Sequence, residues 1–158
     1  MTKPPTACEP RWLSDQEQRS WRAWLSAITL LMDQLNRDLL ADHGLSGADY
    51  EILVRLSESP DRRVRMSELA ELTLASRSRL SHQIDRMEQA GLVRRESCAE
   101  DRRGAFAALT DIGWGALVKA APDHVASVRR HLVDVLTPQE FQALGHACRK
   151  VSERLRGD

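Results

Sequence analysis

The 158-residue sequence is poor in several features that would mark other classes of protein. Its three cysteines, Cys8, Cys98 and Cys148, are odd in number and form no CxxC pair, so the sequence indicates neither a disulfide framework nor a zinc site. No apolar run approaches the roughly 18 residues that a membrane span needs, and the N-terminus lacks the apolar core of a signal peptide. We therefore expect a cytoplasmic protein with no membrane partner.

Motifs of catalysis and of cofactor binding are missing as well. The sequence contains no GxSxG, no P-loop and no glycine-rich dinucleotide turn. Its five histidines show neither the HxxxH nor the HExxH spacing that favours a metal ion. The sequence thus predicts a protein that is not an enzyme and that binds no cofactor and no metal.

Charge of either sign is not in excess, because 23 Lys and Arg balance 23 Asp and Glu. The balance is uneven along the chain: residues 1–59 hold six basic against nine acidic side chains, and residues 60–104 hold ten against eight. A surplus of two charges is common on any solvated face. It indicates only that the middle of the chain is the more basic part.

Helix signals dominate both ends of the chain. Ser14 and Glu17 have the spacing of a capping box, and the apolar stripe that follows predicts a long helix ending near Gly44. Another helix is expected after Thr110, with Pro122 kinking or breaking it. A capping box at Thr137 predicts the last helix.

The apolar stripes of these terminal helices are too extensive for a single chain to bury all of them. We therefore expect packing against a second copy in a two-fold homodimer. A monomeric bundle of the same helices is the alternative. The residues predicted for the dimer interface are Leu132, Phe141, Leu144, Val151 and Leu155.

Two short helices over 68–73 and 77–90, joined by a tight turn, form a candidate helix-turn-helix. At about 100° per residue, Leu80, Ile84 and Met87 fall on one face of the second helix, which we expect to be buried. The opposite face offers arginines, hydroxyls and an imidazole, which suit phosphates and base edges. A solvated surface helix would also be polar outside. The residues predicted to contact DNA are Ser76, Arg77, Ser78, Arg79, Ser81, His82 and Arg86.

A β-hairpin is expected directly after this helix, with strands at 92–96 and 105–109 around a polar turn at 97–104. Arg102 and Arg103 fall at the hairpin tip, where a guanidinium can enter a minor groove or hold the flanking phosphates. Asp101 is placed to pair with Arg103 and fix its direction. The predicted contacts of this wing with DNA are Asp101, Arg102, Arg103 and Gly104.

At these residues the sequence resembles the MarR (multiple antibiotic resistance) family of transcriptional regulators. The resemblance rests on Asp101-Arg102-Arg103-Gly104, on Leu109-Thr110 with Gly113, and on Ile84 to Glu88 with Gly91-Leu92-Val93. It implies a homodimeric repressor or activator that binds palindromic double-stranded DNA operators and is released by small, often phenolic, ligands. It also implies that Arg103 is the wing arginine and Asp101 its bracing partner.

The fold expected is mainly α, with a winged helix-turn-helix lobe, a small β-hairpin wing and a helical dimerisation domain from the N- and C-terminal helices. The predicted divisions are a tail over 1–13, the dimerisation domain over 14–45 and 110–158, and the DNA-binding domain over 46–109.

The crevice between lobe and dimerisation helices is where the resemblance places an effector. The helices around it offer Trp21, Trp24, Tyr50 and Trp114, whose rings suit a planar ligand. The alternative is that these aromatics belong to the core.

Two other functions stay open from the sequence. Cys98, in the expected wing, makes a redox-responsive regulator possible, whereas Cys148 lies on an apolar stripe and is expected to be buried. A winged helix that binds only protein is the second alternative. The balanced charge and Asp85 on the outer helix face support it.

Overall fold

The expected fold class is confirmed by the computed structural model, which describes residues 10–97 and 105–157. These residues form six α-helices and a small antiparallel sheet with strand order β1-β3-β2. The helices are α1 (Asp15–His43), α2 (Gly47–Ser57), α3 (Met66–Leu72), α4 (Arg77–Gln89), α5 (Asp111–His131) and α6 (Pro138–Arg156). The strands are β1 (Arg63–Arg65), β2 (Val93–Ser97) and β3 (Ala105–Leu109), and short 3-10 turns occupy Pro60–Arg62 and Val133–Val135.

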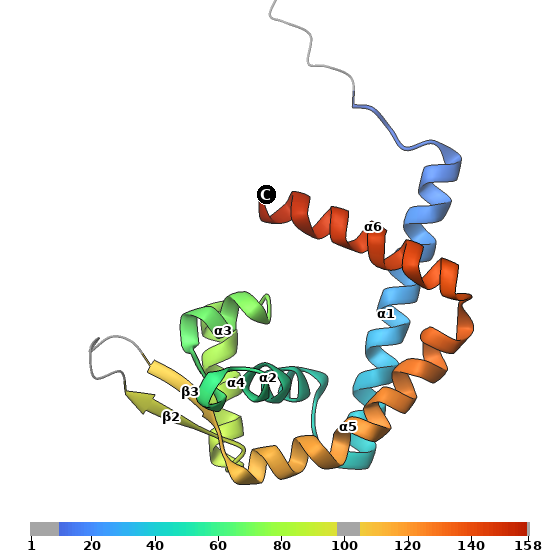
Figure 1. Cartoon of the computed structure of the whole chain (residues 1–158). Coiled ribbons are helices and arrows are strands. Elements are labelled where there is room, and N and C mark those ends of the chain that lie inside the picture. The colour runs from blue at the N-terminus through green and yellow to red at the C-terminus, as the bar shows by residue number, and fades with distance from the viewer. Residues whose placement is uncertain (1–9, 98–104, 158) are drawn as a thin grey trace, which may run out of the picture.

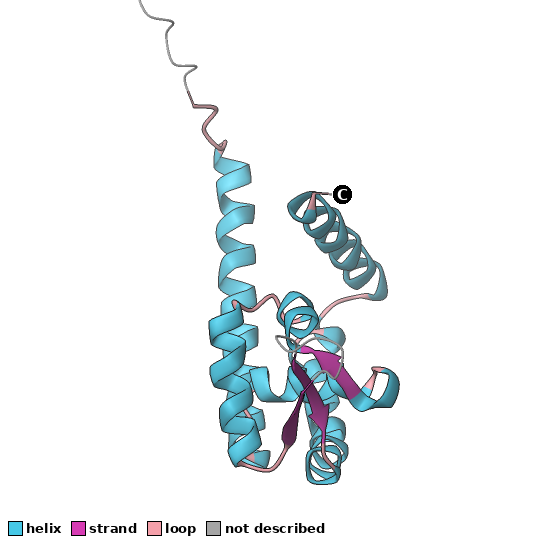
Figure 2. Ribbon diagram, turned by 90° about the vertical axis from the view of Figure 1, so that its left-hand side faces the viewer, coloured by secondary structure: helices cyan, strands magenta, loops and turns pink. Residues whose placement is uncertain are grey.

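The elements form two groups in space. Helices α2, α3 and α4 gather with the sheet into one lobe, while α1, α5 and α6 extend to the other side of the molecule (Figure 1). Figure 2, turned by a quarter, shows the strands within the lobe and α6 standing apart from them. Helix α5 begins at the lobe and runs to the long helices, so it links the two groups. The domain boundaries drawn from the sequence stay a prediction.

The core of the lobe lies between α2, α3, α4 and the sheet. The inward face predicted for α4 is confirmed, because Leu80, Ile84 and Met87 are all buried. Burial of each such side chain stabilises the lobe by about 1.5–3 kcal/mol relative to leaving it in water. The α4 helix is therefore held on one side and free on the other. Its largest buried companions are Leu53, Leu56, Leu69 and Val93.

Both predicted capping boxes are confirmed. The Ser14 hydroxyl accepts from the Glu17 N–H at 3.3 Å, and the Glu17 carboxylate accepts from the Ser14 N–H at 2.8 Å. Thr137 and Glu140 repeat this arrangement at the start of α6. Hydrogen bonds from the capping backbone lower the pKa of both glutamates. These local bonds begin α1 and α6 where the sequence placed them.

Of the two outcomes expected at Pro122, a kink or a break, the break does not occur, since α5 continues from Asp111 to His131. The ribbon of α5 bends along its length instead (Figure 1). Proline removes one backbone hydrogen bond, but side-chain contacts with α1 hold the helix around it. The Ser127 hydroxyl donates to Asp38 of α1 at 2.5 Å, and His43 of α1 lies 3.0 Å from the Asp123 carboxylate. The helix also ends earlier than the apolar pattern suggested, before the turn at Val133–Val135.

The apolar stripe of α6 is not covered in the single chain. No residue of α6 is buried, and Val151 and Leu155 are 56% and 81% exposed. Phe141 is also exposed, whereas Leu132 and Leu144 are half-buried. Cys148 is exposed, so the expectation that it is buried fails in the single chain. The cause is that no other element of the described chain packs over this side of the helix.

Candidate nucleic-acid interface

The free face of α4 begins at a capped N-terminus. The Ser76 hydroxyl accepts from the Arg79 N–H at 3.2 Å, as the sequence predicts. Beyond this cap, the side chains of Arg77, Ser78 and His82 are exposed and make no hydrogen bond or ion pair with the residues that the structure describes. Three donor-rich side chains at the positive end of a helix are suited to phosphates and base edges.

Arg95 of β2 holds the middle of α4 in place, although it was not among the residues predicted for the site. Its Nη2 donates to the carbonyl and hydroxyl oxygens of Ser81, both at 3.0 Å. Its Nη1 lies 2.6 Å from the Asp85 carboxylate, and its backbone N–H donates to the Glu88 carboxylate at 2.6 Å. Strand β2 is thereby tied to α4. The Ser81 hydroxyl is engaged internally, and the Asp85 charge is paired.

Strand alternation explains why two adjacent arginines differ. Successive side chains of a strand point to opposite faces, so Arg95 points to α4 and Arg94 points away from it. Arg94 instead pairs with Glu96 two residues on, at 2.7 Å. Had the strand been read for its period of two, Arg95 would have been identified as the inward arginine.

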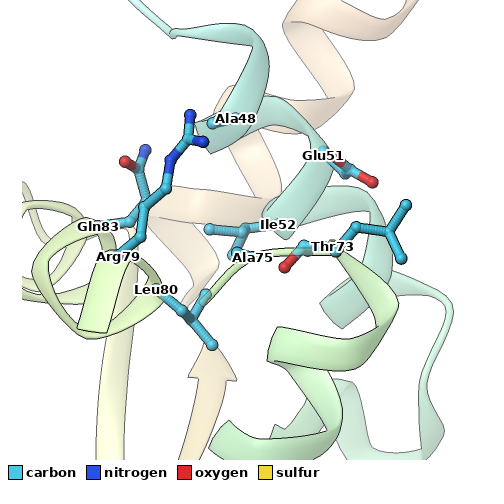
Figure 3. Close-up of a pocket in the computed structure, with 9 residues that line it drawn as sticks. Ala48, Glu51, Ile52, Thr73, Ala75, Arg79, Leu80 and Gln83 are labelled. Carbon is cyan, nitrogen blue, oxygen red and sulfur yellow. The ribbon is translucent and has the colours of Figure 1, made fainter. Parts of the chain in front are cut away.

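Arg79 and Arg86 lie on the side of α4 that is next to α2, together with Gln83, which donates to Asp49 of α2. Figure 3 shows Arg79 and Gln83 directed toward the start of α2 at Ala48, beside a pocket of about 120 Å³. Arg86 donates to Gln83 at 2.5 Å and lies 4.0 Å from Asp49 of α2. Both arginines are exposed, so they remain accessible while contacting this neighbour.

The Leu109-Thr110 and Gly113 motif forms the junction between β3 and α5. The Thr110 hydroxyl lies 2.6 Å from the Gly91 carbonyl, to which it donates, and accepts from the Gly113 N–H at 3.0 Å. A Cβ on Gly113 would stand 2.0 Å from the Leu92 carbonyl oxygen, closer than any real contact. Glycine is therefore required here because the backbone of α5 passes directly over the Leu92 carbonyl, in the link between α4 and β2. The motif fixes the base of the hairpin.

The hairpin itself is an antiparallel pair of β2 with β3, in which Val93 faces Leu109 and Ser97 faces Ala105. This confirms the two expected strands. The residues predicted for its tip, Asp101, Arg102, Arg103 and Gly104, lie outside the described residues, as does Cys98.

The four aromatic residues assigned to an effector do not line one common cavity in the single chain. Trp21 and Trp24 stack on each other with ring centroids 5.5 Å apart, and both are exposed. The ring of Trp114 lies beneath the guanidinium of Arg62, whose central carbon is 4.3 Å from the ring centroid. Of the four residues, Tyr50 alone lines the open cavity of about 820 Å³ between α1, α2 and α5.

Tyr50 contacts His124 of α5 in the wall of this cavity, with ring centroids 4.3 Å apart. Burial raises the pKa of Tyr50 and lowers the pKa of His124, so both side chains are neutral at pH 7. The Nδ1 of His124 and the Nε of Arg55 are buried without a hydrogen-bond partner among the described residues. The cavity wall is thus apolar in part and carries unused polar atoms.

Neither a membrane-spanning helix nor a metal-binding cluster is found in residues 10–97 and 105–157. None of the helices there is both long enough and apolar enough to cross a membrane. Nor do three or more His, Cys, Asp or Glu side chains in these ranges gather closely enough to hold a metal ion.

Comparison with known proteins places the chain in one family. The family model described as "MarR family" matches residues 43–104. The transcriptional regulator PecS of Dickeya dadantii (strain 3937) is 30% identical over 115 residues, which cover 72% of this chain and 67% of PecS. The crystal structure of AbsC, a MarR family transcriptional regulator from Streptomyces coelicolor, is 54% identical and has a TM-score of 0.89, with 94% of this chain and 100% of that chain covered. Sco3205 of the same organism and family, crystallised in complex with DNA, is 49% identical with a TM-score of 0.91, with 94% and 93% covered. The capped recognition helix, the hairpin and the glycine junction are therefore those of a DNA-binding transcriptional regulator, and the chain belongs to the MarR family.

Proposed function

We propose that this protein is a homodimeric repressor that binds a palindromic operator and releases it when a small ligand binds. The observation that carries the proposal is the free face of α4, whose buried side and Arg95 contact hold Arg77, Ser78 and His82 outward. A rigid helix with donors on its free face is what reading of the major groove requires. In this proposal Arg103 enters the adjacent minor groove.

The dimer is supported by the uncovered apolar surface of the terminal helices. Trp21 and Trp24 of α1, with Val151 and Leu155 of α6, are exposed on long helices that extend away from the lobe. A second copy would bury these side chains, and the removal of their apolar surface from water would stabilise the dimer. Two-fold symmetry would also place two α4 helices about 34 Å apart, one turn of DNA, which matches a palindrome.

The effector site that we propose is the 820 Å³ cavity, which lies between the two groups of helices. Tyr50, His124 and the aliphatic side chains around them suit an aromatic ring, and polar groups such as Arg55 suit its substituents. Arg79 and Gln83 reach from α4 to the same cavity. A ligand there would contact the recognition helix as well as the helices that set the spacing of the dimer.

Release from DNA then follows from differential binding. A ligand that binds a dimer of altered spacing more tightly shifts the population away from the form that fits the operator. If the ligand binds the dimer of altered spacing a hundred times more tightly than the form that fits the operator, it can weaken operator binding by up to about a hundredfold, or about 2.7 kcal/mol.

The protein-binding alternative loses one of its supports, because Asp85 is paired with Arg95 rather than free on the helix face. The redox alternative rests on Cys98, which lies outside the described residues.

The test is a titration of fluorescently labelled DNA from upstream of the protein's own gene, measured by anisotropy at two salt concentrations. We expect tight binding whose log-log dependence on salt has a slope of about −0.9 for each phosphate neutralised. Arg103→Ala should weaken it, whereas Arg37→Ala on α1, which removes the same charge outside the lobe, should not. Normal folding with unchanged affinity in Arg103→Ala would refute the role of the wing. If that DNA does not bind, duplexes selected by the protein from a random pool replace it, and failure to select any would refute the function.

A further inference from the structure

Helix α2 begins with a capping box whose carboxylate is shared with α4. The Asp49 Oδ2 atom accepts from the Ser46 N–H at 3.0 Å and from the Ser46 hydroxyl at 2.5 Å. The Asp49 Oδ1 atom accepts from the side-chain N–H of Gln83 on α4. The capping glutamates of α1 and α6 are exposed and, among the described residues, accept only from their own cap residues. The capping box of α2 therefore differs from the other two, because it also joins two helices of the lobe.

Gln83 connects this carboxylate to an arginine of α4. The side-chain carbonyl of Gln83 accepts from Arg86 Nη2 at 2.5 Å, and the same Nη2 lies 4.0 Å from Asp49 Oδ1. The amide thus directs its N–H to a carboxylate and its carbonyl to a guanidinium, which satisfies both of its ends. Gln83 is half-buried, whereas the Arg86 side chain is 63% exposed. Arg86 is therefore held by a neighbour that is fixed in the lobe, while most of its own side chain stays open to solvent.

The other end of this chain of contacts lies on α1. The side-chain carbonyl of Asn36 accepts from the N–H of Gly47, the first residue of α2, at 2.9 Å. Asn36 and Gly47 line the cavity of about 820 Å³ that we propose for the effector, and so does Gln83. Figure 3 shows Gln83 directed toward the start of α2. Contacts therefore run from α1 through the capping box of α2 to α4, along one wall of the cavity.

The charge of Asp49 makes this chain of contacts sensitive to the position of α2. The Asp49 side chain is only 13% exposed. A carboxylate so far removed from water has to be hydrogen-bonded, because an unpaired buried charge carries a large desolvation cost. Among the described residues, Gln83 is the one hydrogen-bond donor to Asp49 that comes from outside the capping box. A shift of α2 against α4 therefore moves or breaks the bond that directs Gln83.

We propose that Gln83 is a positioning residue that couples the cavity to Arg86, and through Arg86 to DNA. The inference rests on the proposed function and on the predicted contact of Arg86 with DNA. With the cavity empty, Gln83 holds Arg86 in the direction that meets the operator. A ligand that bonds to the Gln83 amide, or that displaces the start of α2, releases this arginine. The competing explanation is that Gln83 only packs α2 against α4, and it predicts no dependence on Arg86.

The test is a double-mutant cycle between Gln83 and Arg86, with operator affinity as its readout. The DNA is a palindrome that the protein selects from a random duplex pool, and affinity is measured by anisotropy without any effector. Gln83→Met keeps the length of the side chain and removes both of its hydrogen bonds, so operator affinity should fall by about fivefold. In the Arg86→Ala background the same change should cost less than about twofold, because the arginine that Gln83 directs is already absent.

A matched control exists on α1, where Gln34 bridges a carboxylate and a guanidinium in the same way. Gln34 donates to Asp38 at 2.7 Å and accepts from Arg37 at 2.8 Å. Gln34→Met therefore removes an equivalent pair of hydrogen bonds outside the lobe, and operator affinity should stay that of wild type. Melting temperatures verify that each variant is folded.

Asn36→Ala tests the α1 end of the chain of contacts. It removes the acceptor of the Gly47 N–H, so operator affinity should fall by about threefold in the wild-type background. The same substitution should have no effect once Gln83→Met is present, because the connection to Arg86 is then already broken.

Equal losses from Gln83→Met with and without Arg86 would overturn the inference, since Gln83 would then act by packing or by its own contact with DNA. Arg86→Ala that binds as wild type does, or Asn36→Ala whose effect is absent or does not depend on Gln83, would overturn it as well. Losses of affinity that only follow losses of melting temperature would show a structural role instead. Wild type that binds no selected duplex in a salt-sensitive way would refute the proposed function itself.

Discussion

Arg95 ties the wing strand β2 to α4. Its removal should lower both the stability of the protein and its affinity for DNA, by amounts that can be estimated from its contacts. The side chains of Arg95 and Asp85 are 32% and 43% exposed, so their ion pair contributes at most about 1 kcal/mol. The two bonds from Nη2 to Ser81 share one donor group and add about 1 kcal/mol more. Arg95→Gln should therefore destabilise the protein by about 2 kcal/mol, a fall in Tm of about 4–8 °C.

A double-mutant cycle with Asp85→Asn isolates the ion pair. Urea unfolding of wild type, both single variants and the double variant, at one protein concentration, should give a coupling energy of about 1 kcal/mol between the two positions. A coupling below about 0.3 kcal/mol is within the error of simple additivity and would show that the pair does not hold α4.

DNA binding gives the cycle a second readout. Arg95→Gln leaves the Asp85 carboxylate unpaired on the helix that we propose faces DNA, so affinity for the operator should fall by about tenfold, or about 1.4 kcal/mol. Adding Asp85→Asn to this variant removes the unpaired charge and should restore most of that loss. A double variant that binds no better than Arg95→Gln alone would refute the electrostatic explanation.

Three further changes test the lobe and the cavity wall. Leu80→Asp places an unpaired charge in a core position that is 2% exposed, so circular dichroism should show the lobe unfolded at room temperature; an unchanged Tm would mean that α4 faces the other way. Gly113→Ala places a Cβ against the Leu92 carbonyl, so we expect the free energy of unfolding in urea to fall by about 2–3 kcal/mol and operator binding to weaken. The control is Gly115→Ala, whose Cβ would meet nothing within 4 Å and which should cost little stability. Because burial lowers the pKa of His124 below its unfolded value, the folded state binds this proton less readily, and stability should fall as the pH drops from about 7 through that folded pKa. His124→Asn should reduce this loss, and an identical pH profile in the variant would exclude His124 as its source.

The order and kind of the elements were readable from the sequence because their signals are local. A serine or threonine three residues before a glutamate begins α1 and α6, and apolar spacing of three and four identifies the buried side of α4. Alternation and turn residues predicted the hairpin in the same way. Each of these signals acts within a few residues, so the rest of the fold need not be known. Pro122 does not end α5, and the contacts of Asp123 and Ser127 with α1 hold the helix beyond it.

The partners of side chains were decided only by the tertiary structure. Arg94 and Arg95 are adjacent in sequence, yet one pairs with Glu96 of the same strand and the other with Asp85 of α4. Gly113 is required because a carbonyl twenty-one residues earlier in the chain passes within 2.0 Å of where its Cβ would be. The aromatic residues that we expected in one crevice lie in separate places, because their positions also depend on tertiary packing. Helical periodicity gives the direction of a side chain around its own axis, but which element packs there depends on how helices and strands cross, and that is fixed by the packing of the whole chain.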